Sequence, residues 1–480
     1  MNTPINAIFV NYSTVFDALL ISDLTKRGMN FNLAIGANKT VTDLIEKQGI
    51  KCKYSPDGNR CLDDYLQYPS EKNSGYSMEK FSISNRINIL GDIDNEVENG
   101  LYRKVYAYWD DFIKENSIDL MIVKNTPHEV VEYVMYEAFK NANKKVVVLE
   151  KTYWQGLMLL ITDIFKTTCL INNKTIDVNL DIVNKDGMIP YWTKAKRQLY
   201  GDERNKIFNK LRSFVKLTMQ GIDAKSGFLY GQYKTRDEIS AFNILQKLYL
   251  FVKIATVKKK IIADYNSNVV SLSELPQGRF VIFYLQCEPE KNISPLGGKY
   301  FDQIKAIKTL REWLPEEYNL VVKEHPSQFQ RWHYLEKGRY IGYYSKISEL
   351  GCYLVDHQTE NKEIFAKCSL NISSSGSVGL ESWLMGHKSA YLGSPWYQIF
   401  SEINKISSKA DLLDIINADI SQTTPKEKLE EINKYGFSGA ISSFDIDSTI
   451  LETDIYQSSK IIAESIVEYT NSNNFQPMDF

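Results

Sequence analysis

Short apolar runs alternate with amphipathic stretches in the first third of the chain. The apolar runs fit buried strands, and between them apolar residues recur at helical spacing. The predicted strands are 7–10, 32–35, 51–54, 119–123 and 145–149, and the predicted helices are 15–27, 41–47 and 128–141. Strands that alternate with helices in this way predict a parallel, doubly wound sheet. The polar stretch 55–105 interrupts the alternation and is predicted to be a surface excursion.

The alternation restarts after 271–280, a stretch with the Pro and Gly residues typical of an interdomain linker. Predicted strands follow at 280–285, 320–323, 351–355, 369–372 and 389–392, with helices between them. A chain of 480 residues is too long for a single hydrophobic core. We therefore predict an α/β protein with two doubly wound, Rossmann-like domains that face a cleft.

These patterns also set the predicted domain boundaries. The N-terminal domain spans 1–270 and carries a basic helical insertion near 194–265, and the C-terminal domain spans 271–452. The remaining segment, 453–480, contains an amphipathic stretch that is expected to form a helix and to pack back toward the N-terminal domain.

Composition narrows the class of protein. The net charge of −2 argues against a nucleic-acid binder. Residues 194–260 nevertheless hold 16 Lys and Arg against 5 Asp and Glu, so this segment is either a solvated helical face or a contact with an anionic membrane surface. The 6 cysteines form no C-x-x-C pair, and no signal peptide or membrane span is visible. We expect a cytoplasmic protein, with the inner membrane face as its peripheral site.

A serine-rich turn follows the predicted strand 369–372. Ser373, Ser374, Ser375, Gly376 and Ser377 stand between that strand and a helical stretch. Free backbone N–H groups, hydroxyl donors and a helix N-terminus together favour a phosphate. A plain helix cap would need only one such serine, so we predict a phosphate site here.

The sequence KEHP ends another strand of the same half. Lys323 offers a point charge and His325 can donate to or protonate a departing phosphate, while Pro326 stops the strand. Glu381, four residues past Ser377, either complements the helix dipole or accepts hydrogen bonds from a ribose. A lone histidine at a strand end is more often a cap, but the serine turn nearby favours a site.

KEHP together with SSSGSVGLESWLMGHK resembles bacterial capsule polysaccharide biosynthesis proteins. That family includes Kdo-transferring and related nonulosonic-acid transferases of the two-domain GT-B type, and the pattern is also similar to sialyltransferases that use CMP-sugars. The segments 284–307 and 124–140 fit the family as well. The resemblance implies that the C-terminal domain binds a CMP-linked donor through Lys323, His325 and the serine turn, and that the N-terminal domain binds a glycan or lipid-linked acceptor.

The resemblance also implies a general base in the N-terminal domain and no metal or other cofactor. A base must be a carboxylate or imidazole at a strand end. The favoured candidates are Glu129 and His128, followed by Glu150, and Asp17 is a further one. Gln286, Glu288 and Glu290 stand at a strand end and are interpreted either as cleft residues, with Gln286 and Glu290 as candidate acceptor contacts, or as a polar interdomain loop. Two D-x-D sequences, at 92–94 and 445–447, are interpreted as surface loops rather than metal sites.

Three other functions fit the same pattern. The first is transfer of an alditol phosphate from a CDP-activated precursor, as in teichoic-acid-like polymer synthesis. The second is a UDP-sugar-dependent GT-B enzyme or a UDP-sugar 2-epimerase, and the third is a non-catalytic glycan-binding subunit. The sequence alone favours the CMP-sugar transferase.

Overall fold

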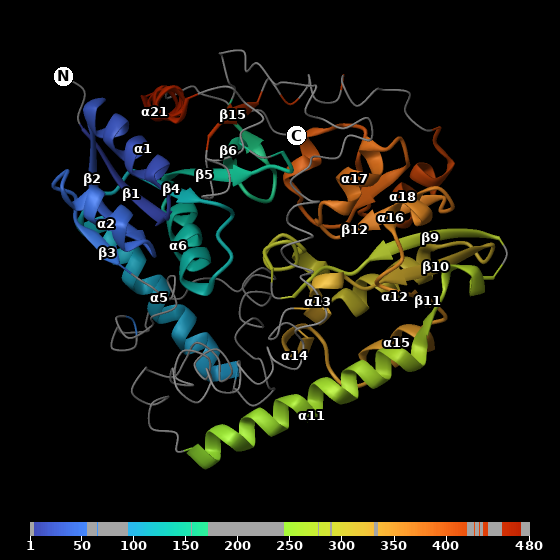
Figure 1. Ribbon diagram of the computed structural model, residues 1–480. Helices are drawn as coiled ribbons and strands as arrows, with labels where there is room; N and C mark the ends of the chain where they lie inside the picture. Colours follow the sequence, from blue (N-terminus) through green and yellow to red (C-terminus); the bar gives the residue numbers. More distant parts are fainter. Residues whose placement is uncertain are drawn as a thin grey trace.

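The computed structural model contains two α/β bodies, each built on its own sheet (Figure 1). It describes residues 4–54, 65, 95–154, 156–170, 244–276, 278–288, 290–330, 335–419, 427, 432, 435–439 and 454–471. Both D-x-D sequences and most of the basic segment 194–265 lie outside the described residues. Two Rossmann-like bodies, with a final helix that returns to the first, form a GT-B type arrangement, so the predicted fold class is confirmed.

The first body has the strand order β15-β6-β5-β4-β1-β2-β3, with β7 paired to β6. Its strands are β1 (Ile5–Tyr12), β2 (Met29–Gly36), β3 (Cys52–Tyr54), β4 (Leu120–Lys124), β5 (Lys145–Lys151), β6 (Leu157–Asp163), β7 (Thr168–Cys169) and β15 (Gly436–Ser438). Pairing is parallel from β3 to β5 and antiparallel at β6, β7 and β15. The antiparallel edge was not predicted.

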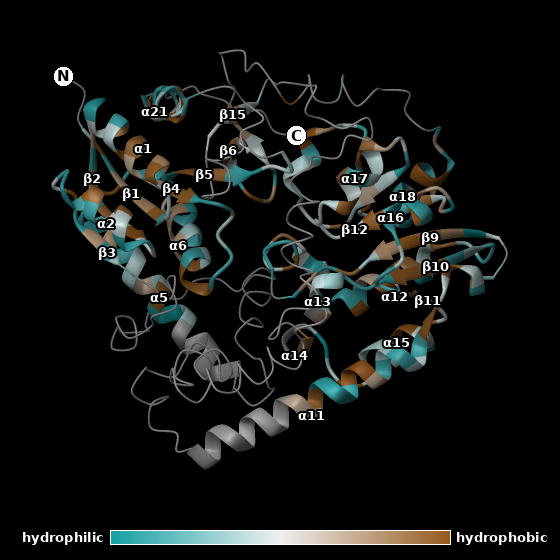
Figure 2. Cartoon of the chain, in the orientation of Figure 1, coloured by the Kyte–Doolittle hydropathy of each residue, from teal (hydrophilic) through white to brown (hydrophobic). Residues whose placement is uncertain are grey.

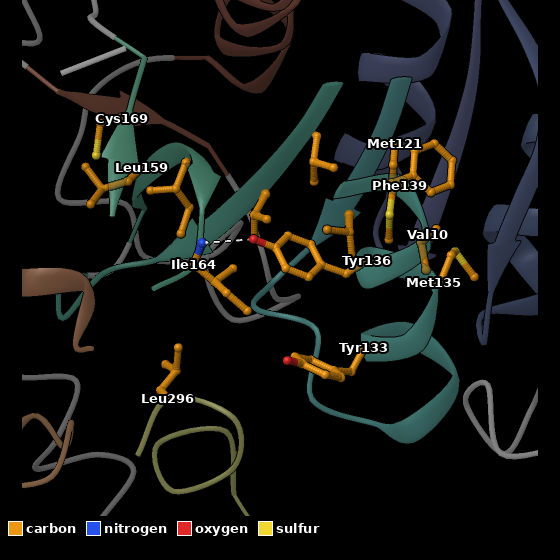
Figure 3. Close-up of a cluster of buried hydrophobic side chains, with 14 of the residues drawn as sticks. Val10, Met121, Tyr133, Met135, Tyr136, Phe139, Leu159, Ile164, Cys169 and Leu296 are labelled. Carbon is orange, nitrogen blue, oxygen red and sulfur yellow. Dashed lines mark hydrogen bonds between the residues drawn. The ribbon is translucent and has the colours of Figure 1, made fainter. Parts of the chain in front are cut away.

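Helices cover both faces of this first sheet. They are α1 (Val15–Lys26), α2 (Lys39–Glu46), α5 (Asn95–Glu115), α6 (Val130–Asn141) and α21 (Ile455–Asn471). Successive residues of a strand point to opposite faces, so Ile8 and Val10 join the core beneath α5 and α6, and Ala7 and Phe9 join the core beneath α1 and α21. Figure 3 shows part of the first core. Burial on both faces explains why these strands are uniformly apolar.

The second body has the strand order β14-β13-β12-β9-β10-β11-β8, and every pairing in it is parallel. Its strands are β8 (Val269–Val270), β9 (Arg279–Tyr284), β10 (Tyr318–Lys323), β11 (Tyr353–Val355), β12 (Leu370–Ser373), β13 (Ser389–Tyr391) and β14 (Asn404–Lys405). Its helices are α11 (Ile244–Asn268), α12 (Gln303–Trp313), α13 (Pro326–Gln330), α14 (Leu335–Gly338), α15 (Tyr343–Glu349), α16 (Asn361–Phe365), α17 (Val378–Leu384) and α18 (Lys409–Asn417).

The described end of the predicted basic insertion belongs to the second body. Helix α11 runs along α14 and α15, and its Ile261 and Tyr265 are buried in the second core (Figures 1 and 2). Strand β8 also pairs with β11, whereas β15 returns to the first sheet. Strand β8 thus lies before the predicted boundary at 270 but belongs to the second sheet, and β15 lies before the predicted boundary at 452 but belongs to the first sheet. None of the described helices is long and apolar enough to cross a membrane.

The predicted return of the C-terminal helix is observed. Helix α21 packs along α1, where the Ser459 hydroxyl donates to Asp23 Oδ2 at 2.7 Å and Arg27 pairs with Glu464 at 2.9 Å. At its end, Lys145 Nζ donates to the carbonyl oxygens of residues 469 and 470 at 2.7 and 2.8 Å. A lysine at the last turn satisfies carbonyls that have no partner within the helix.

Candidate active site

The second sheet has its topological switch point between β9 and β12. The chain goes from β9 to β10 and β11 on one side, then continues on the other side with β12 and β13. Ligands of doubly wound sheets bind beyond the carboxyl ends of the strands at such a point. Ser373, Tyr284 and Lys323 lie in one register row across β12, β9 and β10, so the loops after these three strands leave the sheet side by side.

Hydrogen bonds of two of its serine hydroxyls and of Tyr397 hold the serine turn in place. Ser373 Oγ lies 3.1 Å from the Tyr397 hydroxyl, which donates to the carbonyl of Gly376 at 2.7 Å. Ser375 Oγ donates to the carbonyl of Asn292. Ser374 differs, because its hydroxyl is buried and has no hydrogen-bond partner among the described residues. An unpartnered buried hydroxyl is costly, so this turn retains donor capacity for a ligand.

Gln286 fills the space beside this turn. Its backbone N–H donates to Gln303 Oε1 at 2.6 Å, and its side-chain amide donates to the carbonyl of Tyr284 at 2.9 Å. A Cβ added at Gly376 would lie 2.0 Å from Gln286 Oε1, so only glycine allows this approach. The predicted cleft residue Gln286 and the predicted phosphate turn are therefore in direct contact.

Ser377 and Glu381 form the outer end of the turn. Ser377 precedes α17, and its hydroxyl donates to Glu381 Oε1 at 2.9 Å. The charge of Glu381 adds to burial in raising the pKa of Tyr153 in the first body. Glu381 therefore lies close enough to the first body to act electrostatically on Tyr153.

His325 is held in one tautomer. The backbone N–H of Ser327 donates to His325 Nδ1 at 3.2 Å, which leaves the proton of the neutral ring on Nε2. The backbone N–H of His325 donates to Glu324 Oε1 at 2.6 Å. Pro326 is the first residue of α13, where its missing N–H costs nothing. The loop thus presents an imidazole N–H donor, two strands from the serine turn, or about 10 Å.

Lys323 is turned away from the serine turn. Its ammonium donates to the carbonyl of Thr359 and to Asn361 Oδ1, both at 2.6 Å, and the side chain is buried. Both partners follow β11, which lies on the far side of β10 from β9. The structure therefore brings His325 and the serine turn to one edge but does not bring the Lys323 ammonium to the turn.

Glu324 is bound by Arg339, a residue that no sequence pattern indicated. Arg339 donates to Glu324 Oε2 at 2.6 Å and to Oε1 at 2.9 Å, and the Tyr344 hydroxyl adds a bond of 2.7 Å. Arg339 also donates to the carbonyl of Gln286 at 3.0 Å. The arginine therefore ties the loop after β9 to the loop after β10. The sequence could not indicate this pair, because 15 residues separate Arg339 from Glu324 and only the fold brings them together.

Glu288 completes this network. Its carboxylate accepts from Arg339 at 3.1 Å and from the Gln303 amide. Burial raises the pKa of Glu288 to about 7, although Arg339 acts to lower it. Glu290, the predicted neighbour, is half-buried, and its carbonyl accepts the N–H of Ile293 at 3.1 Å.

The first sheet has its own switch point, between β1 and β4. Each strand has an asparagine with a positive φ at its carboxyl end, 70° at Asn11, just before the last residue of β1, and 69° at Asn125, just after β4. Below them Lys124 forms a buried ion pair of 2.6 Å with Asp17. Asp17 also accepts hydrogen bonds from the N–H groups of residues 13 and 14 at 2.7 and 2.8 Å. Its carboxylate therefore caps the start of α1 rather than facing a substrate.

Glu150, a predicted base, is buried, and both of its carboxylate oxygens accept hydrogen bonds. Its Oε2 accepts from the Thr126 N–H at 2.9 Å and from the Thr126 hydroxyl at 2.6 Å. Its Oε1 pairs with Lys291, which comes from the second body and also donates to Asn125 Oδ1 at 2.6 Å. Donors of the chain itself thus engage both oxygens of this carboxylate.

The start of α6 gathers the other predicted bases. His128 Nδ1 lies 2.9 Å from the carbonyl of Thr126, and Glu129 is the residue before the helix. Glu132, one turn in, was not predicted. Burial first, and then the charge of Glu129, raise the pKa of Glu132 to about 7, while a hydrogen bond with Asn11 acts to lower it. This is the range in which a general base works at neutral pH.

A metal site is not formed by the residues that the structure describes, since no group of three His, Cys, Asp or Glu side chains among them is close enough to hold an ion.

The two bodies also share an apolar contact. The rings of Trp154 and Trp396 meet edge to face at 6.0 Å, and the Thr167 hydroxyl donates to the carbonyl of Pro395 at 3.3 Å. Leu296 and Leu380 of the second body belong to the core beneath α5 and α6, and Leu296 is labelled in Figure 3. The two bodies are therefore joined both by this packing and by the contacts of Lys291.

No family model and no curated protein matches this chain. Among solved structures it is similar to a beta Kdo 2,7 transferase, KpsC, of Thermosulfurimonas dismutans, with 8% identity, coverage of 98% of this chain and 100% of that one, and a TM-score of 0.33. It is also similar to a putative UDP-N-acetylglucosamine 2-epimerase from Listeria monocytogenes, with 11% identity, full coverage of both chains and a TM-score of 0.25. A glycosyltransferase from Rickettsia africae gives 9% identity, 98% and 100% coverage and a TM-score of 0.24. TM-scores and identities this low assign neither an activity nor a substrate to this chain.

Proposed function

We propose that the protein is a glycosyltransferase that moves a sugar from a nucleotide donor to a glycan or glycolipid acceptor. The observation that carries the proposal is the serine turn at the switch point of the second sheet, with the buried Ser374 hydroxyl unpartnered among the described residues. A phosphate bound there would receive hydroxyl and backbone N–H donors. His325 Nε2–H, from the neighbouring loop, would add a further donor.

The first body supplies the complementary chemistry. Glu129 and Glu132 stand at the start of α6, at the carboxyl edge of the first sheet, and the pKa of Glu132 is about 7. In the transfer step the bond between the anomeric carbon and a phosphate oxygen breaks, and its electron pair stays on that oxygen. The acceptor hydroxyl oxygen bonds to the anomeric carbon and gives its proton to this carboxylate pair.

The favoured donor is a CMP-linked Kdo or another nonulosonic acid, and the favoured product is a surface or capsular polysaccharide. This choice is supported by the resemblance of KEHP and the serine turn to CMP-sugar enzymes. We expect transfer without an added metal, so that turnover persists in a chelator. The lysines at 258–260 on α11 are the described part of the proposed membrane contact, and charge reversal there should weaken sedimentation with anionic liposomes.

A nucleotide panel tests the proposal. Ligand binding to the native state raises the melting temperature, so CMP, UMP, UDP, CDP and GDP are compared by thermal shift. Purified protein is then offered CMP-Kdo and CDP-glycerol side by side with an acceptor glycan, and the products are weighed. We expect CMP to stabilise most and free CMP to be released. Product mass that shows an added glycerol phosphate supports the alditol phosphate reading, and isomerisation without acceptor supports an epimerase. Stabilisation by none of the nucleotides overturns the proposed function.

A further inference from the structure

Lys291 carries a positive charge from the second body into the first. It lies in the loop after β9, yet its ammonium donates to Asn125 Oδ1 at 2.6 Å and to Glu150 Oε1. The side chain of Lys291 is 19% exposed, and that of Glu150 is 1% exposed. The ammonium therefore sits at the carboxyl edge of the first sheet, on partners that are fixed by the ends of β4 and β5.

The same loop also rests on the serine turn. The residue after Lys291, Asn292, offers its carbonyl to the Ser375 hydroxyl. Further along, the carbonyl of Leu296 accepts the N–H of Ser394 at 2.8 Å, and a Cβ added at Gly393 would lie 2.3 Å from that oxygen. One end of Lys291 thus adjoins the turn, and its other end touches Glu150. Lys291 and Asn292, which are adjacent in this loop, therefore contact the first edge and the serine turn respectively.

A structural role for this ion pair alone is a weak explanation. The desolvation of two charges largely cancels their attraction, so an apolar pair would hold the bodies together at least as well. The contact of Trp154 with Trp396 already provides such packing. An ammonium has three N–H donors, and Lys291 spends two of them on Asn125 and Glu150 among the described residues. The third donor and the partial exposure leave room for an anion.

Two other cations near this edge, in the described part of the chain, bind protein oxygens instead. Lys323 donates to Thr359 and Asn361, and Arg339 donates to Glu324, Glu288 and two backbone carbonyls. Both side chains are at most 5% exposed. Lys291 is therefore the better placed of the three to meet a ligand.

We propose that Lys291 binds the phosphate oxygen from which the sugar departs. The inference rests on the proposed glycosyltransferase function and deepens it. When the bond to the anomeric carbon breaks, the electron pair stays on the phosphate oxygen and the phosphate gains one negative charge. A positioned ammonium stabilises that developing charge. Glu150 and Asn125 position Lys291, so Glu150 acts in this site as the anchor of a cation rather than as a base.

Binding of CMP compared with cytidine tests this assignment, because the two ligands differ only in the phosphate. Titration calorimetry compares the wild type with Lys291→Met, Lys291→Arg and Glu150→Gln. The control is Lys308→Met, which removes a lysine from an exposed pair with Glu312 at 3.9 Å. Melting temperatures of all variants are measured first, and Lys291→Arg keeps the charge if Lys291→Met is unstable. UMP and uridine are run in parallel.

For Lys291→Met we expect CMP affinity to fall about tenfold or more, as for loss of a hydrogen bond to a charged group, with cytidine affinity unchanged. Lys291→Arg should keep most of the CMP affinity, and Lys308→Met should keep all of it. Glu150→Gln removes the anchoring charge but keeps an oxygen that can accept from the ammonium, so it should weaken CMP binding less than Lys291→Met does. If the wild type prefers CMP to cytidine and Lys291→Met retains that preference, this inference is overturned and the proposed function stands. If the wild type binds none of the four ligands, the proposed function falls and this inference falls with it.

Discussion

The carboxyl edges of the two sheets differ in the groups that they offer. The second edge offers neutral donors, namely serine hydroxyls, the His325 Nε2–H and backbone N–H groups. The first edge offers carboxylates, with Glu129 and Glu132 at the start of α6. Donors suit an anion and carboxylates suit a proton, which agrees with the proposed division of a sugar transfer between the two bodies.

Each edge is also built on one buried ion pair. In the first sheet Lys124 pairs with Asp17 at 2.6 Å, and in the second Arg339 pairs with Glu324 at 2.6 Å. In the first pair the Asp17 carboxylate, a candidate base in the sequence, is engaged by Lys124 and by the backbone at the start of α1. The second pair holds the two loops that present Gln286 and His325. The same type of interaction therefore supports the fold in one body and the site in the other.

The largest expected effect comes from removing the proton acceptor of the first edge. Glu132→Gln should lower turnover by roughly 100- to 10,000-fold, the usual contribution of a general base, and leave CMP affinity unchanged. In the wild type, kcat/KM should rise with pH through about 7, where the Glu132 carboxyl loses its proton. Steady-state rates between about pH 5 and pH 9 give the turnover of Glu132→Gln and the pH dependence of kcat/KM in the wild type. Wild-type activity in Glu132→Gln would assign the base elsewhere, with Glu129→Gln as the next variant.

The second expected effect separates the two ion pairs. Arg339→Met and Lys124→Met should each lower the free energy of unfolding by about 3–5 kcal/mol, because each leaves a buried carboxylate without its cation. Only Arg339→Met should also weaken CMP binding, since only Arg339 holds the loops of the second edge. Urea unfolding and calorimetry measure the two quantities. Equal CMP affinity in both variants would show that the Arg339 network is not needed to shape the site.

A smaller effect is expected at the serine turn. Ser374→Ala removes a buried hydroxyl that has no partner among the described residues, so the free protein should be as stable as the wild type or slightly more stable. CMP should bind about tenfold more weakly, in keeping with the loss of about 1.5 kcal/mol or more for one hydrogen bond to a charged phosphate. Ser382→Ala is a matched control, since the Ser382 hydroxyl is also buried and without a partner in the described part of the chain, but lies within α17. Equal CMP affinity in wild type and Ser374→Ala would remove Ser374 from the phosphate site.

The last effect concerns how the free energy of unfolding depends on pH. The pKa of Glu132 in the folded state, about 7, lies above its ordinary value of 4.5, so the folded state binds the proton more tightly. Its contribution to stability is therefore complete below about pH 4.5 and is lost as pH rises through about 7. Glu132→Gln should flatten the dependence of unfolding free energy on pH in this window. An unchanged slope would mean that Glu132 is not the titrating group.

The sequence by itself determined the two sheets and the location of the serine turn. Uniformly apolar runs such as 120–123 and 320–322 must be buried on both faces, and alternation with helices makes the pairing of their strands parallel. The turn at 373–377 was predictable because strand, serines and helix are contiguous in the chain. The antiparallel β15 could not be predicted, since its three residues follow a long separation from β6.

The tertiary structure alone decided which charges reach the site. Lys323 stands beside His325 in sequence, but the order of β9, β10 and β11 sends its ammonium to the loop after β11. No sequence motif indicates Lys291, Glu132 or Arg339. Their roles depend on partners elsewhere in the chain, and Glu150, for example, lies 141 residues from Lys291. Local patterns predict strands and helices because the spacing of apolar residues along a short segment decides which of its faces is buried, whereas the partner of a charged side chain depends on which strands become neighbours.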